Sequence, residues 1–328
     1  MRATLLFLAA ACALRAQQPT VENAKLETRT FSGSITSELQ RAGGGPFWLA
    51  WSEPIIPGQH GDMCSWNSNG DYGRSPGTPV RLEGETALVI LVRIENSKPD
   101  QLRVTSPDCR LDAGGLPFYW INNVPAAESV AWLKTQVSGA HSESAIMAIS
   151  RHRDAAADRA LEDLTSLTQA VEVRKRAAFW LGNSRGAQAT PVLKRMLAGD
   201  PNADVRDRVV MALSQSKDPN GIPLVIEAAR NDKDPHIRGQ ALFWLAQRAA
   251  AQVSKDAIQN ALTNDPDSAV RERAVFALTQ IPNNGGVPQL IDLAKMHRDP
   301  AVRKKAMFWL GQSKDPRALD FFAQVLKP

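Results

Sequence analysis

Few residues in this chain stand in a spacing that supports catalysis. Ser, His and Asp all occur, but nothing in their spacing singles out a nucleophilic triad, and there is no Gly-rich phosphate loop or Cys-x-x-Cys pair. The five histidines are His60, His141, His152, His236 and His297. We therefore assign no catalytic residue, no metal ligand and no cofactor, and we expect His141 and His152 to be single solvated side chains.

Oxygen-bearing side chains gather around Gly70. Asn67, Asn69 and Asp71 occupy alternate positions, and Asp62 lies nearby. Alternating oxygen ligands can hold calcium, but the glycine does not stand where an EF-hand loop needs it. We interpret the cluster as Asx and glycine turns, with a calcium site as the alternative.

The N-terminus has the pattern of a secretory signal peptide. Arg2 precedes an apolar run over residues 3–14, which is too short to span a membrane, and small residues follow up to Ala16. Cleavage after Ala13 or after Ala16 fits the pattern. A lipid anchor on Cys12 is the alternative to a freely exported protein.

Loss of residues 1–16 leaves two cysteines, Cys64 and Cys109. Exported proteins mature in an oxidising compartment, where a single cysteine pair favours one disulfide. We expect a periplasmic or extracellular protein with a Cys64–Cys109 disulfide and no transmembrane helix.

Composition sets broad limits. A chain of 328 residues with 43% hydrophobic and 22% charged residues is typical of a globular protein of about two domains, which excludes wholesale disorder. The formal net charge of +5 is too small to indicate a polyanionic partner by itself.

Residues 20–125 are predicted to form a small, mostly β domain with an irregular loop over residues 57–79. The run over 87–95 is rich in β-branched residues. It precedes a turn at 96–100 and a run at 102–105, which together predict a hairpin with a five-residue connection. Further strands are expected at 47–51 and 118–121.

Residues 126–328 contain an internal repeat of 32 or 33 residues. Each copy has Val or Ile followed by Arg, at Val173-Arg174, Val205-Arg206, Ile237-Arg238, Val270-Arg271 and Val302-Arg303. Asp-Pro pairs at Asp200, Asp218, Asp234, Asp265, Asp299 and Asp315 are expected to start helices, because Asp caps free backbone N–H groups and Pro suits the first helical position. The pattern predicts about six stacked helix pairs and a closing helix over Arg317–Leu326.

The repeat Asp-Pro-x-Val-Arg-x-x-Ala-x-x-Ala-Leu-Gly resembles HEAT-like repeats of the short phycobilin-lyase type, over residues 127–328. The resemblance implies an α-solenoid whose second helices line the concave surface. Such repeats serve as binding scaffolds, bilin lyase subunits and deoxyhypusine hydroxylase. The last of these would imply a di-iron site built from His-Glu dipeptides, and this chain has none.

The repeated arginines have two possible uses. A basic ladder can bind nucleic acid, but an Arg at this position is better explained as a bridge to an aspartate of a neighbouring repeat. We favour the bridge and expect no nucleic-acid partner. The five positions are Arg174, Arg206, Arg238, Arg271 and Arg303.

A helical wheel for one repeat places Val173, Ala177, Trp180 and Leu181 in the buried stripe, with Phe179 well away from its centre. Trp180 alternates with Ala in successive repeats, which favours core packing between layers.

An apolar residue recurs at the position of Phe179. We predict a binding ladder on the concave face; the alternative is that these side chains pack between adjacent helices. The ladder residues are Met147, Phe179, Met211, Phe243, Phe276 and Phe308, flanked by Lys175, Arg208, Arg273 and Lys304.

The sequence as a whole predicts an exported, two-domain scaffold that binds a protein or peptide of unknown identity on this ladder. The alternatives are a chromophore- or cofactor-handling subunit of the bilin-lyase type and an envelope spacer without a particular ligand.

Overall fold

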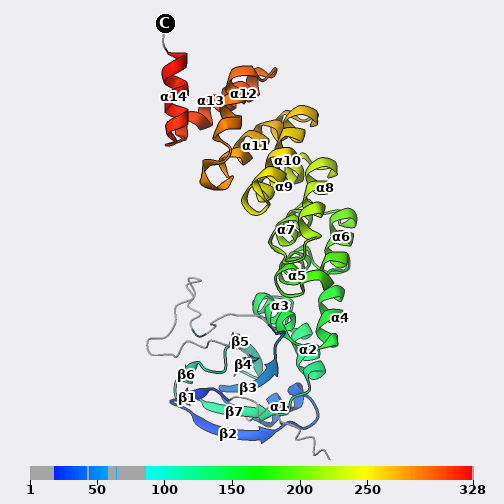
Figure 1. Cartoon of the computed structure of the whole chain (residues 1–328). Coiled ribbons are helices and arrows are strands. Elements are labelled where there is room, and N and C mark those ends of the chain that lie inside the picture. Colours follow the sequence, from blue (N-terminus) through cyan, green and yellow to red (C-terminus); the bar gives the residue numbers. More distant parts are fainter. Residues whose placement is uncertain (1–17, 43, 58–63, 65–85, 327–328) are drawn as a thin grey trace, which may run out of the picture. The chain divides into compact units, whose positions relative to one another are not determined.

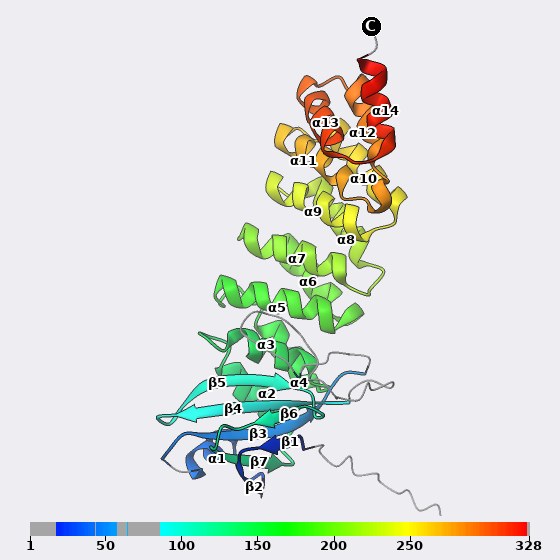
Figure 2. The same ribbon diagram turned by 90° about the vertical axis from the view of Figure 1, so that its left-hand side faces the viewer.

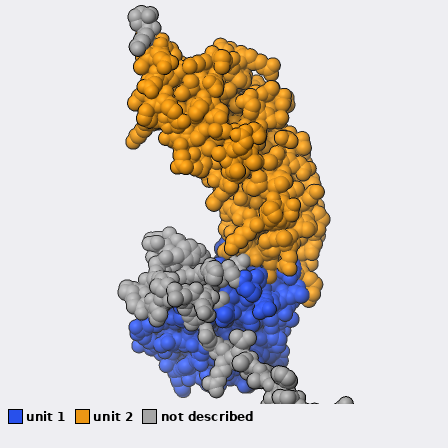
Figure 3. Space-filling model, viewed as in Figure 1, with its two compact units in different colours: residues 1–158 blue, residues 159–328 orange. Residues whose placement is uncertain are grey.

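The structure is a computed structural model that describes residues 18–42, 44–57, 64 and 86–326. It divides into two compact units, Met1–Asp158 and Arg159–Pro328, which Figure 3 colours separately. The expected signal peptide and the turn cluster around Gly70 lie outside the described residues. In the described part, no helix is long and apolar enough to cross a membrane.

Strands build most of the first unit (Figure 1). They are β1 (Thr20–Glu22), β2 (Lys25–Thr30), β3 (Phe47–Pro54), β4 (Ala87–Glu95), β5 (Lys98–Thr105), β6 (Arg110–Asp112) and β7 (Pro117–Asn122). Five of them form one sheet in the order β2-β7-β3-β4-β5, and β1 pairs with β6. Strands β2, β7 and β3 are parallel, whereas β3, β4 and β5 are antiparallel. Strands β3, β4 and β7 lie where the apolar runs predict them.

The β4–β5 hairpin is tighter than the sequence suggested. Glu95 pairs with Lys98, so Asn96 and Ser97 form a two-residue connection, and the expected five-residue connection is wrong. Both residues have positive φ, 53° and 62°, as in the type I′ turn whose twist matches the flanking strands. Strand β5 then runs through Pro99, which is tolerated because β5 is an edge strand.

The centre of the five-stranded sheet is buried on both faces. On one face, Leu91 and Phe118 belong to a core cluster against which Val21 of β1 packs. On the other face, the Trp51 ring meets Trp132 of helix α2 (Ala126–Thr135) edge-on at 5.7 Å. Strand β4 is therefore apolar along almost its whole length rather than alternating.

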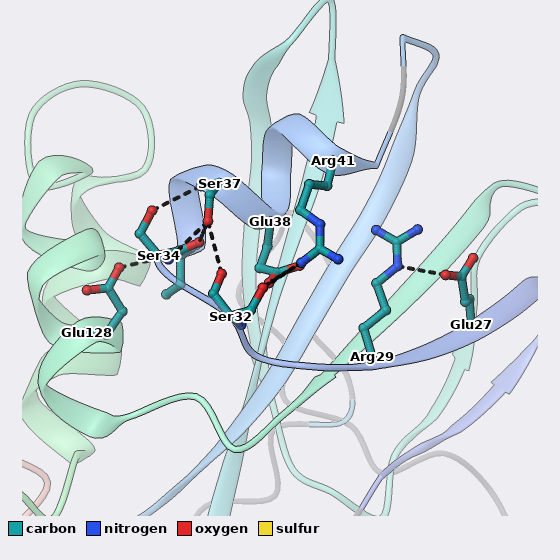
Figure 4. A network of polar contacts seen from close by, with 9 residues as sticks. Glu27, Arg29, Ser32, Ser34, Ser37, Glu38, Arg41 and Glu128 are labelled. Atoms are coloured by element: carbon teal, nitrogen blue, oxygen red, sulfur yellow. Dashed lines mark hydrogen bonds and ion pairs between the residues drawn. The ribbon is translucent and has the colours of Figure 1, made fainter.

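The short helix α1 (Ile35–Arg41) is fixed at its N-terminus by a capping box between Ser34 and Ser37 (Figure 4). Buried Glu38 accepts hydrogen bonds from the Ser32 backbone N–H at 3.0 Å and from Arg41 at 3.1 Å. The capping box satisfies backbone N–H groups that a helix start would otherwise leave unpaired.

Helices form most of the described chain after β7. They are α2, α3 (Ser142–Arg151), α4 (Ala155–Asp163), α5 (Val171–Ser184), α6 (Thr190–Gly199), α7 (Ala203–Gln215), α8 (Gly221–Asn231), α9 (Pro235–Arg248), α10 (Ala251–Asn264), α11 (Ser268–Thr279), α12 (Val287–Met296), α13 (Pro300–Gln312) and α14 (Pro316–Val325). Short 3-10 turns lie at Gly186–Gln188 and Pro282–Asn284. The compact units divide inside α4, because α2 and α3 pack with the sheet in the first unit.

The second unit stacks its helices in two layers. Helices α5, α7, α9, α11 and α13 contact one another in succession and run side by side in Figure 2. We call them the second-helix layer. Helices α6, α8, α10 and α12 lie behind, each packed on the second helix that follows it, and α14 packs on α12.

Asp-Pro pairs start three of the six helices expected of them. Asp234, Asp299 and Asp315 are N-caps whose side chains accept from the first turn. At the other three positions the expectation is wrong, because the helix starts later behind a different cap residue. These positions are Asp200, Asp218 and Asp265, and the caps are Asn202, Asn220 and Asp267.

Candidate interaction surface

The repeated arginines are structural. Arg174 in α5 is 5% exposed, and its guanidinium donates to both carboxylate oxygens of Asp200, at 2.7 and 3.0 Å. Its Nη1 also donates to the carbonyl of Gln169, just before the helix. Each such arginine therefore joins the start of its own helix to the chain before the next one. The corresponding pairs are Arg206–Asp232, Arg238–Asp265 and Arg271–Asp299.

These contacts confirm the predicted bridge at four of the five arginines and place the guanidinium groups of Arg174, Arg206 and Arg238 in the interior. Arg303 instead donates to the carbonyls of His297 and Arg298. The hydrogen bond that Arg206 donates to Asp232 raises the pKa of Arg206, and the one that Arg238 donates to Asp265 raises the pKa of Arg238. Burial opposes ionisation of Asp265, but donation by Arg238 and the Asp267 backbone N–H outweighs it and lowers the pKa of that carboxyl. Buried charges paired this well hold repeats in register and leave few donors for an outside ligand.

Two polar positions before a second helix encode this arrangement. The Asp-Pro pattern does not distinguish the position that caps the helix from the one that receives the arginine. One polar residue stands three positions before the first buried Val or Ile and caps the helix. Another stands five positions before it and receives the arginine. The receiving and capping pairs are Asp200 and Asn202, Asp232 and Asp234, and Asp265 and Asp267.

Tryptophan lies at the edge of the buried stripe, not inside it. Val173, Ala177 and Leu181 are buried as expected, but so is Ala178, while Trp180 is half-buried. Helix α5 packs on α7 beside it and on α6, and its buried residues include Arg174 and Ala178. Placing Trp180 in the buried stripe is therefore wrong. The indole is pushed toward the same surface as Phe179.

The predicted ladder residues of the second unit lie on one surface. Phe179, Met211, Phe243 and Phe276 are half-buried, and Phe308 is 53% exposed. Met147 lies in α3 of the first unit and is 6% exposed, so the structure does not bring it to this surface. The half-buried tryptophans Trp180, Trp244 and Trp309 join the surface instead. We call the five ladder residues and three tryptophans of the second unit the aromatic row.

Ring contacts make the row continuous over α9, α11 and α13. Phe243 and Phe276 stack nearly parallel, with centroids 6.2 Å apart and 6° between their planes. Phe276 also meets Trp309 at 5.0 Å, and Trp309 meets Phe308 edge-on at 5.0 Å. Trp244 packs edge-on against Phe243 at 5.2 Å. These five rings form one apolar strip across three repeats.

Basic side chains line one side of the row. The Arg208 guanidinium lies 5.9 Å from the Phe179 ring centroid, and it reaches the Met211 sulfur at 3.7 Å. Lys175 is paired with Glu172 at 2.9 Å, and Lys304 is exposed.

Arg273 lies across α9 because Gly239 leaves space for it. A Cβ at Gly239 would stand 2.4 Å from Arg273 Cδ. The guanidinium donates to the His236 ring nitrogen at 2.8 Å and to its carbonyl at 3.1 Å. The glycine thus lets a cation run alongside the aromatic row.

A shallow groove of about 530 Å³ opens beside the row, lined by Phe276 and Trp309 with Arg273, Lys305 and Glu272. Lys305 and Glu272 pair across it at 3.3 Å. The groove thus combines an aromatic floor with a charged rim.

The first unit contains a Ser–His contact that is closed to any substrate. Ser129 Oγ lies 2.9 Å from His152 Nε2, and both residues are fully buried. The expectation of a solvated His152 is wrong, because Ile55 of the segment after β3 pairs with it and covers it. Trp51 Nε1 donates to the same hydroxyl at 2.9 Å. A buried serine without a path for substrate is a structural group.

A cavity of about 920 Å³ in the first unit is lined by charged side chains that already have partners. Arg110 contacts Glu22, and Arg103 donates to Gln101. Among the described residues, Cys64, Asp108 and Cys109 are close enough to share a metal, but the two sulfurs are joined as a disulfide. The aromatic row is therefore the better candidate site.

Stacked helix pairs, buried Arg–Asp bridges and an apolar row on one layer define an α-solenoid of the HEAT type. The sequence matches HEAT repeats over residues 161–246 and 256–328. These two stretches of the helical region are HEAT repeats. Comparison with curated proteins finds no match.

Three of the solved structures that this chain matches are the following. The CpcE–CpcF phycocyanin lyase complex of Nostoc sp. PCC7120 is 21% identical, with 58% of this chain and 77% of that chain covered and a TM-score of 0.33. Human deoxyhypusine hydroxylase is 21% identical, with 63% and 80% covered and a TM-score of 0.27. The Escherichia coli protein YibA is 20% identical, with 63% and 83% covered and a TM-score of 0.34. At these identities and TM-scores the likenesses carry no conclusion about ligand or activity.

Proposed function

We propose that this protein is an interaction scaffold that binds a segment of another protein on the aromatic row, the concave side of the solenoid. The observation that supports it is the continuous strip of partly exposed rings from Trp244 to Phe308 across three repeats. Aromatic groups with a polar rim are the usual composition of an interface that holds a partner.

The second unit has a core that does not depend on the rings. Residues such as Val205, Leu245 and Val270 are fully buried and make that core. The Arg–Asp bridges add a link between repeats. The rings also contact one another between repeats, and their partial exposure beside this core supports a role in binding.

The test removes two rings at the centre of the row. We expect Phe243→Ser with Phe276→Ser to abolish capture of the partner identified by crosslinking in the native host, and to change the melting temperature little. The matched control is Phe321→Ser, which removes a ring that is 3% exposed and should cost on the order of 3–5 kcal/mol. If the row variant loses as much stability as this control, the rings belong to the core and the binding role is wrong.

We also propose that the protein works outside the cytoplasm. The Cys64–Cys109 disulfide supports this, because such bonds persist in oxidising compartments. Intact-mass measurement of protein from its native host should show a chain that starts after Ala13 or Ala16. A mass that includes residues 1–16 would contradict export by cleavage, and an added lipid mass on Cys12 would show an anchored form.

A further inference from the structure

We infer that the outer face of α13 binds the acidic start of a helix from another protein, in the way that each earlier second helix binds the next. The outer face consists of Arg303, Met307 and Gly311, which stand four residues apart and share one side of the helix. The inference goes beyond the scaffold function and does not involve the aromatic row. It is carried by a comparison inside the molecule. Four second helices have this face covered, and α13, the last of the layer in the described chain, has it open (Figure 2).

Arg303 makes only one side of the Arg–Asp bridge. Its Nη1 donates to the carbonyls of His297 and Arg298, at 2.7 and 3.2 Å, just as Nη1 of Arg271 donates to two carbonyls before its own helix. In Arg271 the other edge of the guanidinium, Nε and Nη2, donates to the Asp299 carboxylate. The same edge of Arg303 has no acceptor among the described residues. The guanidinium is therefore fixed in the orientation that receives a carboxylate, but the carboxylate is missing.

The two other positions of the outer face are also uncovered. Met307 is half-buried, whereas the corresponding residues of the four earlier second helices are fully buried. These residues are Ala178, Val210, Leu242 and Val275. Gly311 is exposed, whereas the corresponding Gly182 lies so close to the next second helix that a Cβ would stand 2.8 Å from the Ala212 Cβ. The outer face of α13 thus lacks the neighbour that the same face has in every earlier repeat.

Helix α14 adds exposed apolar side chains at the same end of the stack. Leu319 is 63% exposed, and Leu326, just after the last turn, is 79% exposed. Phe322 is half-buried and lies between them at a spacing of three and four residues, so the three share one side of the helix. Among the described residues, most of the exposed large hydrophobic side chains fall within 296–326. Exposed apolar groups gathered in this way mark an interaction site.

Charge decides which partner fits this end. Residues 287–326 carry seven basic and four acidic side chains, and every ionisable side chain of α13 is basic. Contact between the outer faces of two copies of this chain would bring the two Arg303 side chains together, which like-charge repulsion disfavours. A helix with an aspartate two residues before its N-cap, as Asp265 stands before Asp267, supplies the missing carboxylate and the opposite charge. The partner that fits is therefore a protein with a helix start of this kind.

The experiment measures binding of a labelled synthetic peptide to the full chain by fluorescence anisotropy. The probe has the sequence of residues 263–280, the segment whose Asp265 receives Arg238 within the molecule. A hydrocarbon staple replaces Glu272 and Phe276, which line the surface groove, and holds the peptide helical. The comparison peptide has asparagine in place of Asp265. We expect the aspartate peptide to bind at least about tenfold more tightly, because an amide has one acceptor oxygen and no charge to offer the guanidinium.

Variants place the peptide on the outer face. Arg303→Gln should abolish the preference for the aspartate peptide. Lys304→Gln is the matched control, because it removes the same charge from an exposed neighbour and should leave the preference unchanged. Gly311→Leu should block docking, since the corresponding Gly182 has no room for a side chain beside the next helix. A Cβ at Gly311 meets nothing within 4 Å, so this variant should unfold at no lower temperature than the wild type.

Failure to bind either peptide, equal affinity for both, or a preference that survives Arg303→Gln would overturn the inference. Light scattering of the full chain tests the other occupant. Self-association that Gly311→Leu abolishes would place a second copy on the outer face, and the inference would then be wrong. The scaffold function is tested separately, because Phe243→Ser with Phe276→Ser should leave binding of the aspartate peptide unchanged.

Discussion

Glu53 is a carboxyl group enclosed by the core of the first unit. It lies on β3, is 2% exposed, and its Oε1 has no hydrogen-bond partner among the described residues. Burial raises the pKa of Glu53 to about 8; the Asp154 carboxylate adds to the rise, and a hydrogen bond with Ser129 opposes it. The His152 Nδ1 donates to the Ala148 carbonyl at 2.7 Å, and Ser129 Oγ lies 2.9 Å from His152 Nε2. Below a pH of about 8, Glu53 therefore holds a proton inside the folded unit.

This proton makes stability depend on pH. Between the ordinary pKa of 4.5 and about 8, the folded chain holds a proton that the unfolded chain has released. The free energy of unfolding should therefore fall as pH rises through this window, by on the order of 5 kcal/mol in total, and stay level above it. Urea titrations followed by near-ultraviolet circular dichroism, from pH 5 to pH 9, would measure the fall.

Replacement of Glu53 by Gln should remove the dependence, because the amide keeps the shape of the protonated acid. The variant should be the more stable protein at pH 8 and above. Glu38→Gln is the control: Glu38 is equally buried but pairs with Arg41 and accepts from Ser32, so its loss should destabilise. A wild-type stability that is flat from pH 5 to pH 8 would contradict a protonated Glu53.

Two second helices carry the same four residues, Phe-Trp-Leu-Gly, and still differ in packing. In α5, a Cβ at Gly182 would stand 2.7 Å from the Ala212 carbonyl oxygen and 2.8 Å from Ala212 Cβ in α7. In α13, a Cβ at Gly311 would meet nothing within 4 Å. The difference arises because α7 packs on α5, whereas no later second helix packs on α13 in the described part of the chain.

Alanine at these two positions should therefore have opposite effects. Gly182→Ala should force α5 and α7 apart and cost about 1–3 kcal/mol. Gly311→Ala should stabilise its helix by up to about 1 kcal/mol, the usual difference between the two residues in a helix. Thermal unfolding followed by far-ultraviolet circular dichroism measures both. Equal shifts in the same direction would show that helix propensity, not helix approach, governs Gly182.

The molecule consists of two compact units, each with a core of its own. The first is a sheet packed with α2 and α3, and the second is a stack of helices whose contacts connect neighbouring repeats. The Cys64–Cys109 disulfide lies in the first unit and spans a sequence separation of 45 residues. Its effect on stability should therefore be confined to that unit.

Reduction should lower the stability of the first unit by about 4 kcal/mol, the value that loop closure gives for this length. The transition of the second unit should not move. Calorimetry with and without a reductant separates the two, and Cys64→Ser with Cys109→Ser should reproduce the effect of reduction. Labelling of both thiols in unreduced, unfolded mature protein would contradict the bond.

The sequence alone determined the features that repetition and composition encode. A period of 32 or 33 residues, with buried Val, Ala and Leu at fixed positions, specifies stacked helices, because one helix pair cannot bury its apolar face alone. A 100° wheel also separates Phe179 from the buried stripe, and its side chain is half-buried in the structure. The runs at β3, β4 and β7 were long enough to identify strands.

Only the tertiary structure decided which partner each polar group has and which side chains are buried. Asp200 receives the Arg174 guanidinium while Asn202 caps the helix, and the burial of Trp180 depends on how wide an arc its neighbours cover. His152 is buried by a segment nearly a hundred residues away in sequence, which no local pattern records. The physical reason is common to all three: local pattern fixes which face of an element is apolar, whereas the partner of a polar group depends on which element packs there.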